Sequence, residues 1–407
     1  MAIDFLAATV FVTLALATLL LRLVSGWRAG GACEPRLPPG SRGLPLVGET
    51  LEFFTASPIL ELLPFFKRRL ERYGPIFRTS LVGEDLIVSL DPELSARVLQ
   101  QEERAFQIWY PSSFMRVFGA DNIITALGPL HRHMRALMLR LFGPERASAS
   151  SCSAMCSGAR APSCGRGSAD RTSRSGRPPP GYVDMIFGVT AKKLISHDDA
   201  AAQGSLWKCF DACTRGLLAF PAQHSTRGSE KVMKMLKRQL GERRDAAAER
   251  GAVDFFDVVI DELEKPGSEM NESIALDLLF LMLFASHDTT SIGLTAILKF
   301  LTDNPEALQE LTEEHERIQK RRAHPDSEIT WELGDTPEPV GCSKDFMAFG
   351  GGARLCVGAD FAKLQMSIFL HCLLTEYRWK AIGGSTMVFY PGLRFPDGFH
   401  IHLLPKD

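Results

Sequence analysis

Residues 349–358 constrain this chain most, because they surround one cysteine with glycines, an aromatic residue and an arginine directly before a helical pattern. A cysteine binds a metal as the thiolate, and a nearby guanidinium, a helix N-terminus and backbone N–H groups favour that anion. The glycines allow the backbone to approach a flat cofactor closely. We therefore expect a cofactor site with Cys356 as ligand; the alternative is a glycine-rich turn with a buried, inert cysteine.

Spelled F-x-x-G-x-R-x-C-x-G, the segment resembles the signature of the cytochrome P450 monooxygenases at every defined position. The resemblance implies the cytochrome P450 fold and haem b, with Cys356 as the axial ligand of the iron. It also places Phe349 in the cofactor site and Arg354 on a haem propionate. In such sites the thiolate donates electron density to the iron and favours O–O cleavage.

A polar cluster interrupts the apolar helical pattern around residues 278–301 and includes Ser286, His287, Asp288 and Thr289. Polar groups in a buried helix need a reason. The family motif A-G-x-D-T-T matches here, with Ser286 in place of its glycine, so we expect Asp288 and Thr289 to relay protons during oxygen activation. The alternative is that these hydroxyls bond to the preceding helical turn. His287 is expected on the helix surface or in packing, not as a metal ligand.

His131 and Arg135 are four residues apart and therefore share one face of a predicted helix. In the resembling family a W/H-x-x-x-R pair on an early helix contacts a haem propionate, and a cationic, hydrogen-bonding face suits a carboxylate. A basic, solvated helix face is the alternative for these residues.

The amino-acid sequence of residues 344–352 and 378–380 is similar to that of plant cytochromes P450 related to brassinosteroid, abscisic acid and diterpenoid oxidases. The resemblance implies insertion of one oxygen atom from O2 into a lipophilic, steroid-like or terpenoid-like substrate. Electrons would come from NADPH through a membrane-bound reductase. A net charge of −2 gives no general bias toward nucleic acid, and no nucleic-acid partner is expected.

The N-terminus carries an uncharged apolar run over residues 5–21, preceded by Asp4 and followed by arginines. We expect a retained membrane anchor over residues 1–24, with the body on the cytosolic side of the endoplasmic reticulum. Residues 25–50 form a proline-rich hinge, and residues 51–407 form the catalytic domain. Nine cysteines without regular spacing do not indicate a disulfide framework, as expected for a reducing compartment.

Hydrophobic periodicity predicts a mainly α fold with a minor β part. A hairpin is expected from strands at residues 75–81 and 86–90 around Gly83, Glu84 and Asp85. Asp303, Asn304 and Pro305 should stop one helix and start the next. Helices are expected at residues 57–70, from 91, at 130–141, from about 182, at 232–250, 254–264, 272–300 and 306–322, and from Cys356 to about 377.

Two regions depart from the family. Residues 147–180 are rich in Ser, Arg, Gly, Cys and Pro without hydrophobic period, and we expect them to be disordered. The family's E-x-x-R helix is not convincingly present: Glu314 and Arg317 fit the spelling, but Arg317 lies only 39 residues before Cys356 (356 − 317). The join near residues 331–339, between Thr336 and Pro337, resembles an excision.

Two alternatives to a working monooxygenase follow from these departures. The first is a catalytically inactive, membrane-anchored remnant or splice variant that binds haem poorly or not at all. A haem sensor, which binds haem without oxidising a substrate, is the second.

Overall fold

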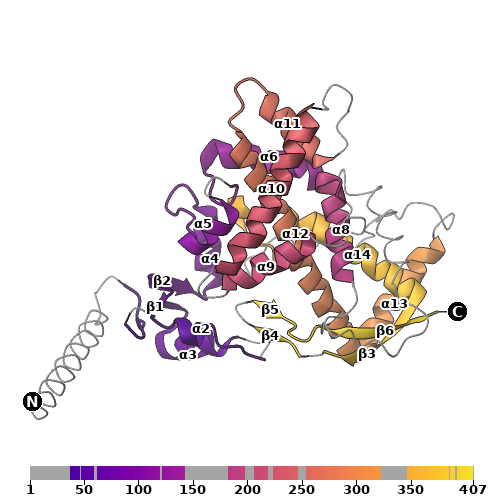
Figure 1. Ribbon diagram of the computed structural model, residues 1–407. Helices are drawn as coiled ribbons and strands as arrows, with labels where there is room; N and C mark the ends of the chain where they lie inside the picture. The colour runs from indigo at the N-terminus through magenta and orange to yellow at the C-terminus, as the bar shows by residue number, and fades with distance from the viewer. Residues whose placement is uncertain are drawn as a thin grey trace, which may run out of the picture. The chain divides into compact units, whose positions relative to one another are not determined.

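The computed structural model describes residues 37–45, 47–58, 62–119, 122–142, 182–197, 206–218, 223–245, 254–321, 346–384, 386–389 and 392–406. The predicted anchor, the biased segment and the join at residues 331–339 lie outside them. The described part is mainly helical with small two-stranded sheets, as predicted (Figure 1).

Its helices are α2 (Thr50–Phe53), α3 (Pro64–Tyr73), α4 (Pro92–Gln100), α5 (Ser112–Phe118), α6 (Gly128–Phe142), α8 (Tyr182–Ile195), α9 (Leu206–Leu218), α10 (Gln223–Asp245), α11 (Phe255–Glu264), α12 (Glu272–Asp303), α13 (Pro305–Arg321) and α14 (Ala359–Glu376). The strands are β1 (Ile76–Leu81), β2 (Glu84–Ser89), β3 (Tyr377–Gly383), β4 (Val388–Phe389), β5 (Leu393–Arg394) and β6 (His400–Pro405).

The chain divides into two compact units. Unit 1 comprises Met1–Gln100, Cys342–Met347 and Thr386–Asp397; unit 2 comprises Gln101–Gly341, Ala348–Ser385 and Gly398–Asp407. Unit 1 therefore holds the β1–β2 hairpin, α2 to α4 and the β4–β5 pair. Unit 2 holds the long helices, the antiparallel β3–β6 pair and Cys356.

The predicted hairpin is present in unit 1, with Ile76 opposite Ser89 and Leu81 opposite Glu84. Its turn is shorter than predicted, because β2 begins at Glu84 and not at residue 86. Residues of the predicted hinge pair with this hairpin: the Ser41 N–H donates to the carbonyl of Arg78 at 3.2 Å. The second half of the proline-rich segment is therefore part of unit 1.

The predicted start of the first helix at Ser57 is wrong. The backbone of Ser57 pairs with that of Phe389, with N–H to carbonyl distances of 3.2 and 2.8 Å, and α3 begins only at Pro64. Leu63 has an extended ψ of 142°, as expected for a residue before proline, and Pro64 then starts the helix. The helix ends at Gly74, whose φ of +88° suits glycine.

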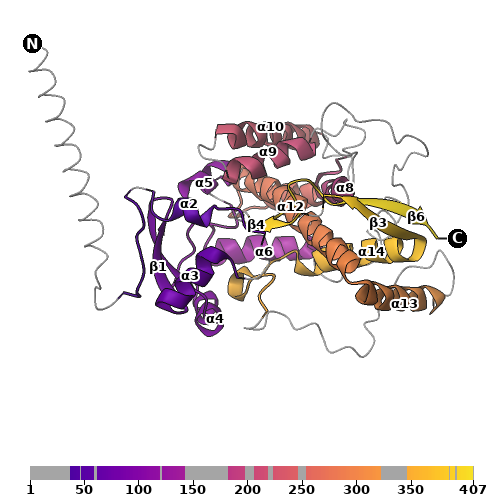
Figure 2. The ribbon, with the colours of Figure 1, turned by 90° about the horizontal axis from the view of Figure 1, so that it is seen from below.

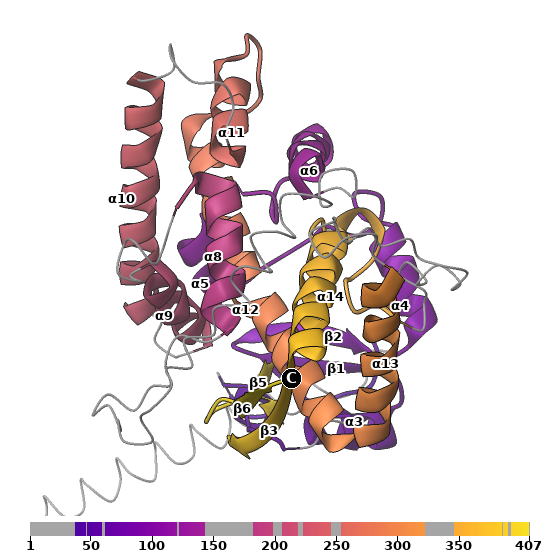
Figure 3. The same cartoon turned by 90° about the vertical axis from the view of Figure 1, so that its right-hand side faces the viewer.

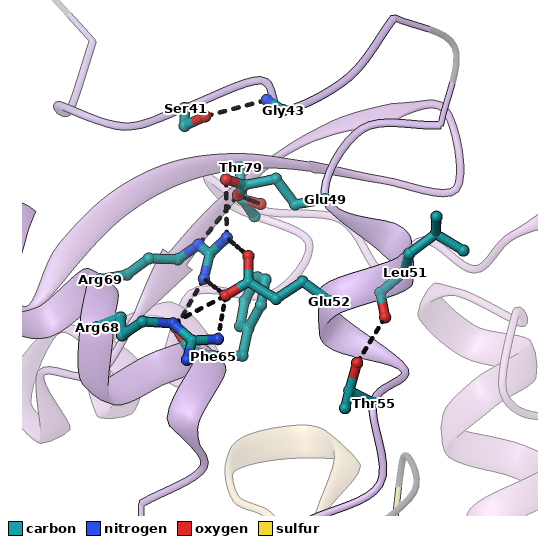
Figure 4. A network of polar contacts seen from close by, with 10 residues as sticks. All are labelled: Ser41, Gly43, Glu49, Leu51, Glu52, Thr55, Phe65, Arg68, Arg69 and Thr79. Carbon is teal, nitrogen blue, oxygen red and sulfur yellow. Dashed lines mark hydrogen bonds and ion pairs between the residues drawn. The ribbon is translucent and has the colours of Figure 1, made fainter.

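A buried arginine stabilises unit 1. The Arg69 guanidinium donates to Glu49 (Nε to Oε2, 3.0 Å) and to Glu52 (Nη2 to Oε2, 2.8 Å), and lies 3.6 Å from the Phe65 ring centroid. Thr79 on β1 donates to Glu49 at 2.6 Å (Figure 4). Burial lowers the pKa of Arg69, but its bonds to Glu52 and Glu49 outweigh burial and the pKa is raised. This charge network links the turn before α2, helix α3 and β1.

Helix α12 forms the centre of unit 2 and packs against α8, α9, α10 and α13 (Figure 2). Every side chain from Ile274 to Leu283 is buried. Asn271 caps the helix by accepting the Ile274 N–H at 2.9 Å. Among the described residues α12 alone is long and apolar enough to cross a membrane, yet its packing makes it a core helix.

Helices α13 and α14 pack together and support the C-terminal strands (Figure 3). The buried side chains of His315 and His371 meet between them, with 3.1 Å between their Nδ1 atoms. As predicted, α12 ends at Asp303 and α13 restarts at Pro305. The described architecture thus surrounds α12 with helices and brings α14, which follows the cysteine loop, into the same unit.

Candidate active site

Cys356 lies on a loop that is shaped by glycine and ends at the start of α14. Gly350 and Gly352 have φ of +77° and +60°, a region that side chains disfavour. The Cys356 N–H donates to the carbonyl of Phe349 at 2.9 Å, and its carbonyl accepts the Ala359 N–H at 3.3 Å. The Cys356 side chain is exposed, and it lies just before the N-terminal end of the 18-residue helix α14. The structure therefore does not support the alternative of a buried, inert cysteine.

Arg354 connects this loop to the segment between α4 and α6. Its Nε donates to Glu102 Oε1 at 2.6 Å. Its two other nitrogens donate to main-chain carbonyls of the 122–126 turn, which are those of Ile123 (2.7 Å), Ile124 (3.2 Å) and Ala126 (2.7 Å). Most of the guanidinium is thus bonded to protein, which leaves little of it for the propionate contact expected from the sequence.

His131 and Arg135 lie beside the same loop, as their shared helix face predicted. Arg135 Nη1 donates to the carbonyl of Leu355 at 2.6 Å. His131 is buried, and its pKa is lowered by burial and by the charges of Arg354 and Arg135, against the opposing effect of Glu102. His131 is therefore neutral at pH 7. The expected cationic face is carried by Arg135, while His131 is a neutral hydrogen-bonding group.

The middle of α12 opens toward solvent between two buried stretches. Ala285 and Thr289 are exposed, whereas Thr290 and Ser291 are buried. The Thr289 hydroxyl donates to the carbonyl of Ala285 at 2.8 Å. This bond to the preceding helical turn is the one expected if Thr289 has no role in proton transfer. The hydroxyl oxygen nevertheless remains accessible as a hydrogen-bond acceptor.

The other members of the predicted cluster differ from Thr289. The Ser286 hydroxyl donates to the carbonyl of Leu283 at 3.0 Å, so the residue in the glycine position is satisfied within the helix. Asp288 is half-buried. The side chain of His287 lies outside the described residues.

The donor set of the described residues fits haem. No group of three or more His, Cys, Asp or Glu side chains in that part of the chain could hold a metal ion, so Cys356 is a single thiolate donor. Arg135 and His131 lie beside the cysteine loop and can donate to carboxylates. A single axial thiolate with donors for two propionates is the combination that haem requires.

Sequence reasoning missed Glu102 and the 122–126 turn. Glu102 precedes Arg354 by 252 residues, and its surroundings in the sequence carry no motif. The turn is held by Asn122, which is fully buried and whose side chain accepts the Ile124 N–H at 2.8 Å. No sequence signal links these residues to the cysteine loop.

Glu314 and Arg317 do not form the family's buried Glu/Arg network. Both are exposed on α13, and Arg317 Nε donates to the carbonyl of Glu313 at 3.3 Å. Their exposure gives no support for a role of this E-x-x-R spelling in such a network.

Comparison with known proteins gives relatives of one kind. The rice (Oryza sativa subsp. japonica) protein "Cytochrome P450 87A3" is 38% identical, over 91% of this chain and 87% of the rice protein. Cucurbitadienol 11-hydroxylase of Siraitia grosvenorii is 31% identical, over 97% and 99% of the two chains. Beta-amyrin 16-alpha-hydroxylase of Maesa lanceolata is 30% identical, over 91% and 93%.

The fold is also that of solved cytochromes P450. A retinoic acid-bound cyanobacterial CYP120A1 superposes with a TM-score of 0.70 at 20% identity, covering 91% of this chain and 99% of that one. A zebrafish cytochrome P450 crystallised with abiraterone gives a TM-score of 0.63 at 15% identity, covering 84% and 99%. At these identities the likeness concerns the fold alone.

The alignment with the rice protein spans 453 positions but uses 91% of this 407-residue chain, or about 370 residues, so about 80 positions (453 less about 370) have no residue here. The family model for cytochrome P450 matches residues 38–159, 191–333 and 336–392. Its interruptions fall at the biased segment and near residue 335. Because the matched ranges cover most of the chain and include the cysteine loop, this chain belongs to the cytochrome P450 family and is a monooxygenase by family.

Proposed function

We propose that this chain is a membrane-anchored enzyme that inserts one oxygen atom from O2 into a lipophilic, steroid-like or triterpenoid-like substrate, with electrons from NADPH through a reductase. The exposed Cys356 thiol at the start of α14, beside Arg135 and His131, is the observation that carries the proposal. The substrate class is supported by the names of relatives, among them hydroxylases of cucurbitadienol and beta-amyrin and a steroid (22S)-hydroxylase.

In this proposal the residues around the loop hold the cofactor. Bound haem supplies the activation of O2. Cys356 binds the iron through its sulfur, and the Cys356 N–H bond to Phe349 keeps the loop in place. Arg135 donates to a propionate as a cation, and neutral His131 donates one ring N–H. Arg354 donates to a propionate through the one N–H that is not bonded to protein.

Asp288 and Thr289 manage protons in this proposal. Thr289 is exposed in the middle of α12, where its hydroxyl oxygen can accept a hydrogen bond from a water molecule or a protonated oxygen. The half-buried Asp288 carboxylate, one residue earlier, can exchange protons with solvent. Together they form a short route from solvent to an exposed hydroxyl, which general acid catalysis requires.

The membrane location rests on the sequence. The apolar run at residues 5–21 would anchor the chain in the endoplasmic reticulum, with the body on the cytosolic side, where the reductase would deliver electrons. Gly40 and Gly48, which follow the proposed anchor in the sequence, pair with residues of β1.

The test is the carbon monoxide difference spectrum of the full chain expressed in membranes with added haem. We expect the absorption band typical of thiolate-ligated, reduced, carbonyl-bound haem, and its loss in Cys356→Ala. Cys372→Ala is the matched control, because Cys372 is a buried cysteine on α14. A Cys356→Ala protein that retains the band would overturn the assignment of the ligand.

A second candidate is an inactive remnant. It is favoured by the roughly 80 aligned positions without a residue and by the exposure of Glu314 and Arg317. A truncated core leaves polar groups unpaired, at about 1–3 kcal/mol each, against a total stability of about 5–15 kcal/mol. Folded protein without the thiolate band would support this candidate. Full-length transcript sequencing that recovers a longer reading frame would assign the activity to the longer chain.

A further inference from the structure

Glu102 forms a mostly buried ion pair with the arginine of the cysteine loop. The distance from Arg354 Nε to Glu102 Oε1 is 2.6 Å, and the two side chains are 15% and 12% exposed. Glu102 follows α4, and its backbone forms a bridge with that of Phe106. Its partner Arg354 is two residues before the proposed ligand Cys356 in the sequence.

The remaining bonds of Arg354 fix the guanidinium in one orientation. A guanidinium has five N–H groups. The Nε–H donates to Glu102, Nη1 donates to the carbonyls of Ile123 and Ile124, and Nη2 donates to the carbonyl of Ala126. A single N–H on Nη2 is left for another acceptor. Protein groups thus accept four hydrogen bonds from the guanidinium, and the carboxylate of Glu102 compensates its charge.

Resting on the proposed function, we infer that Glu102 is a positioning residue for the haem site, which aims Arg354 and cancels much of its charge next to the cysteine loop. The propionates would then be met chiefly by Arg135 and by neutral His131. Glu102 would also lower the local electrostatic potential, because a charge in a poorly solvated site acts over several ångströms. The opposing effects of Arg354 and Glu102 on the pKa of His131 show that both charges reach helix α6.

Glu102→Gln isolates the charge. Gln has the same shape and can still accept from Arg354 Nε, but the compensating negative charge is gone. Reduction adds one electron to the iron, and a less negative surrounding favours the reduced form. We expect the equilibrium constant for one-electron reduction of the haem-loaded full chain to increase about threefold to tenfold. A tenfold increase corresponds to a reduction potential that is higher by about 59 mV. A spectroscopic redox titration with mediators measures this shift.

Two further variants separate charge from structure. Glu103→Gln removes a neighbouring charge that also acts on His131, but Glu103 faces Arg132 at 4.0 Å, is 36% exposed and is screened by solvent, so the shift in potential should be clearly smaller than in Glu102→Gln. Glu102→Asp keeps the charge and should remain closer to wild type than Glu102→Gln. If Glu102→Gln loses the thiolate band while Glu102→Asp retains it, the inference is supported as well.

The outcomes that overturn the inference are distinct from those that overturn the function. An unchanged potential in Glu102→Gln, or an equal shift in Glu103→Gln, would refute the role of Glu102 and leave the monooxygenase proposal intact. Loss of the band in both Glu102 variants would mean that the pair is merely structural. A wild-type chain without the band would refute both proposals.

Discussion

Each unit contains an arginine that pairs with carboxylates and is largely removed from solvent, Arg69 in unit 1 and Arg354 in unit 2, and the two arginines are used differently. Arg69 in unit 1 is paired with Glu49 and Glu52, both at most 20 residues away in the sequence. Arg354 in unit 2 has one carboxylate partner, Glu102, and otherwise donates to main-chain carbonyls 228 to 231 residues away. The first arginine carries two compensating charges within a local network, whereas the second connects distant segments.

The difference separates a structural network from one that is open to a ligand. The Arg69 side chain is 6% exposed, and donates to the carboxylates on one side and to the carbonyl of Phe65 on the other. Near Arg354, the guanidinium of Arg135 donates to the carbonyl of Leu355, and His131 is neutral. Positive charge therefore exceeds negative charge beside Cys356, as an anionic cofactor requires.

Arg354→Ala should give the largest effect. Removing one partner of a buried ion pair leaves Glu102 uncompensated and costs about 3–5 kcal/mol. Since three carbonyls of the 122–126 turn also lose their donor, we expect the thiolate band to disappear. Denaturant unfolding and the carbonyl spectrum measure the two effects. A variant with wild-type stability and a full band would show that the cysteine loop holds without Arg354.

Arg69→Ala should lower stability by about 3 kcal/mol, because Glu49, whose side chain is 10% exposed, loses the charge of Arg69, while Glu52 keeps only the exposed Arg68. Folded protein should nevertheless show the full carbonyl band per mole, since Arg69 belongs to a different unit from Cys356. Arg72→Ala is the control: Arg72 is exposed on the same helix, and its loss should change stability by less than about 0.5 kcal/mol. A lost band in folded Arg69→Ala would contradict the division of roles.

Thr79→Val should cost about 2 kcal/mol. The buried Thr79 hydroxyl donates to the charged Glu49 carboxylate at 2.6 Å, and valine keeps the shape without the donor. Thr55→Val is the matched control, because the exposed Thr55 hydroxyl bonds only the carbonyl of Leu51 in the same view (Figure 4). Equal losses in chemical denaturation for both variants would mean that the Arg69 network gains nothing from Thr79.

Glu52→Gln should have the smallest effect and should show it mainly through pH. The bond from Arg69 chiefly lowers the pKa of Glu52 from 4.5 to about 2. A depressed carboxyl pKa stabilises the fold above pH 4.5, and this contribution is lost as the pH falls from 4.5 toward 2. The variant should therefore show a weaker acid dependence of stability in that window, and an unchanged pH profile would remove Glu52 from the network.

Local patterns predicted most of the secondary structure and the central ligand loop. The hairpin, the helix break at Asp303 to Pro305 and the start of α4 at Pro92 follow from residues next to one another in the sequence. The start of α3 was wrong because Ser57 pairs instead with Phe389, more than 300 residues later. Such a pairing competes with a local cap and leaves no sequence signature.

The candidate site shows the same division. Cys356, its glycines and the pair His131 and Arg135 could be singled out from short motifs that resemble those of the family, because each motif depends on local backbone geometry. Glu102 could not, and neither could the bonds that occupy Arg354. Long-range partners are chosen when the chain folds, from all carboxylates and carbonyls that the packing brings near.

By itself, the sequence determined the family and the helical period and predicted Cys356 as the ligand, since these depend on residue types at short separations. Tertiary structure decided the charge state of His131, the partners of Arg354 and the exposure of Thr289 within a buried helix. The physical reason is that burial and long-range pairing set the desolvation and electrostatic energies of these groups, and both exist only once distant segments are packed together.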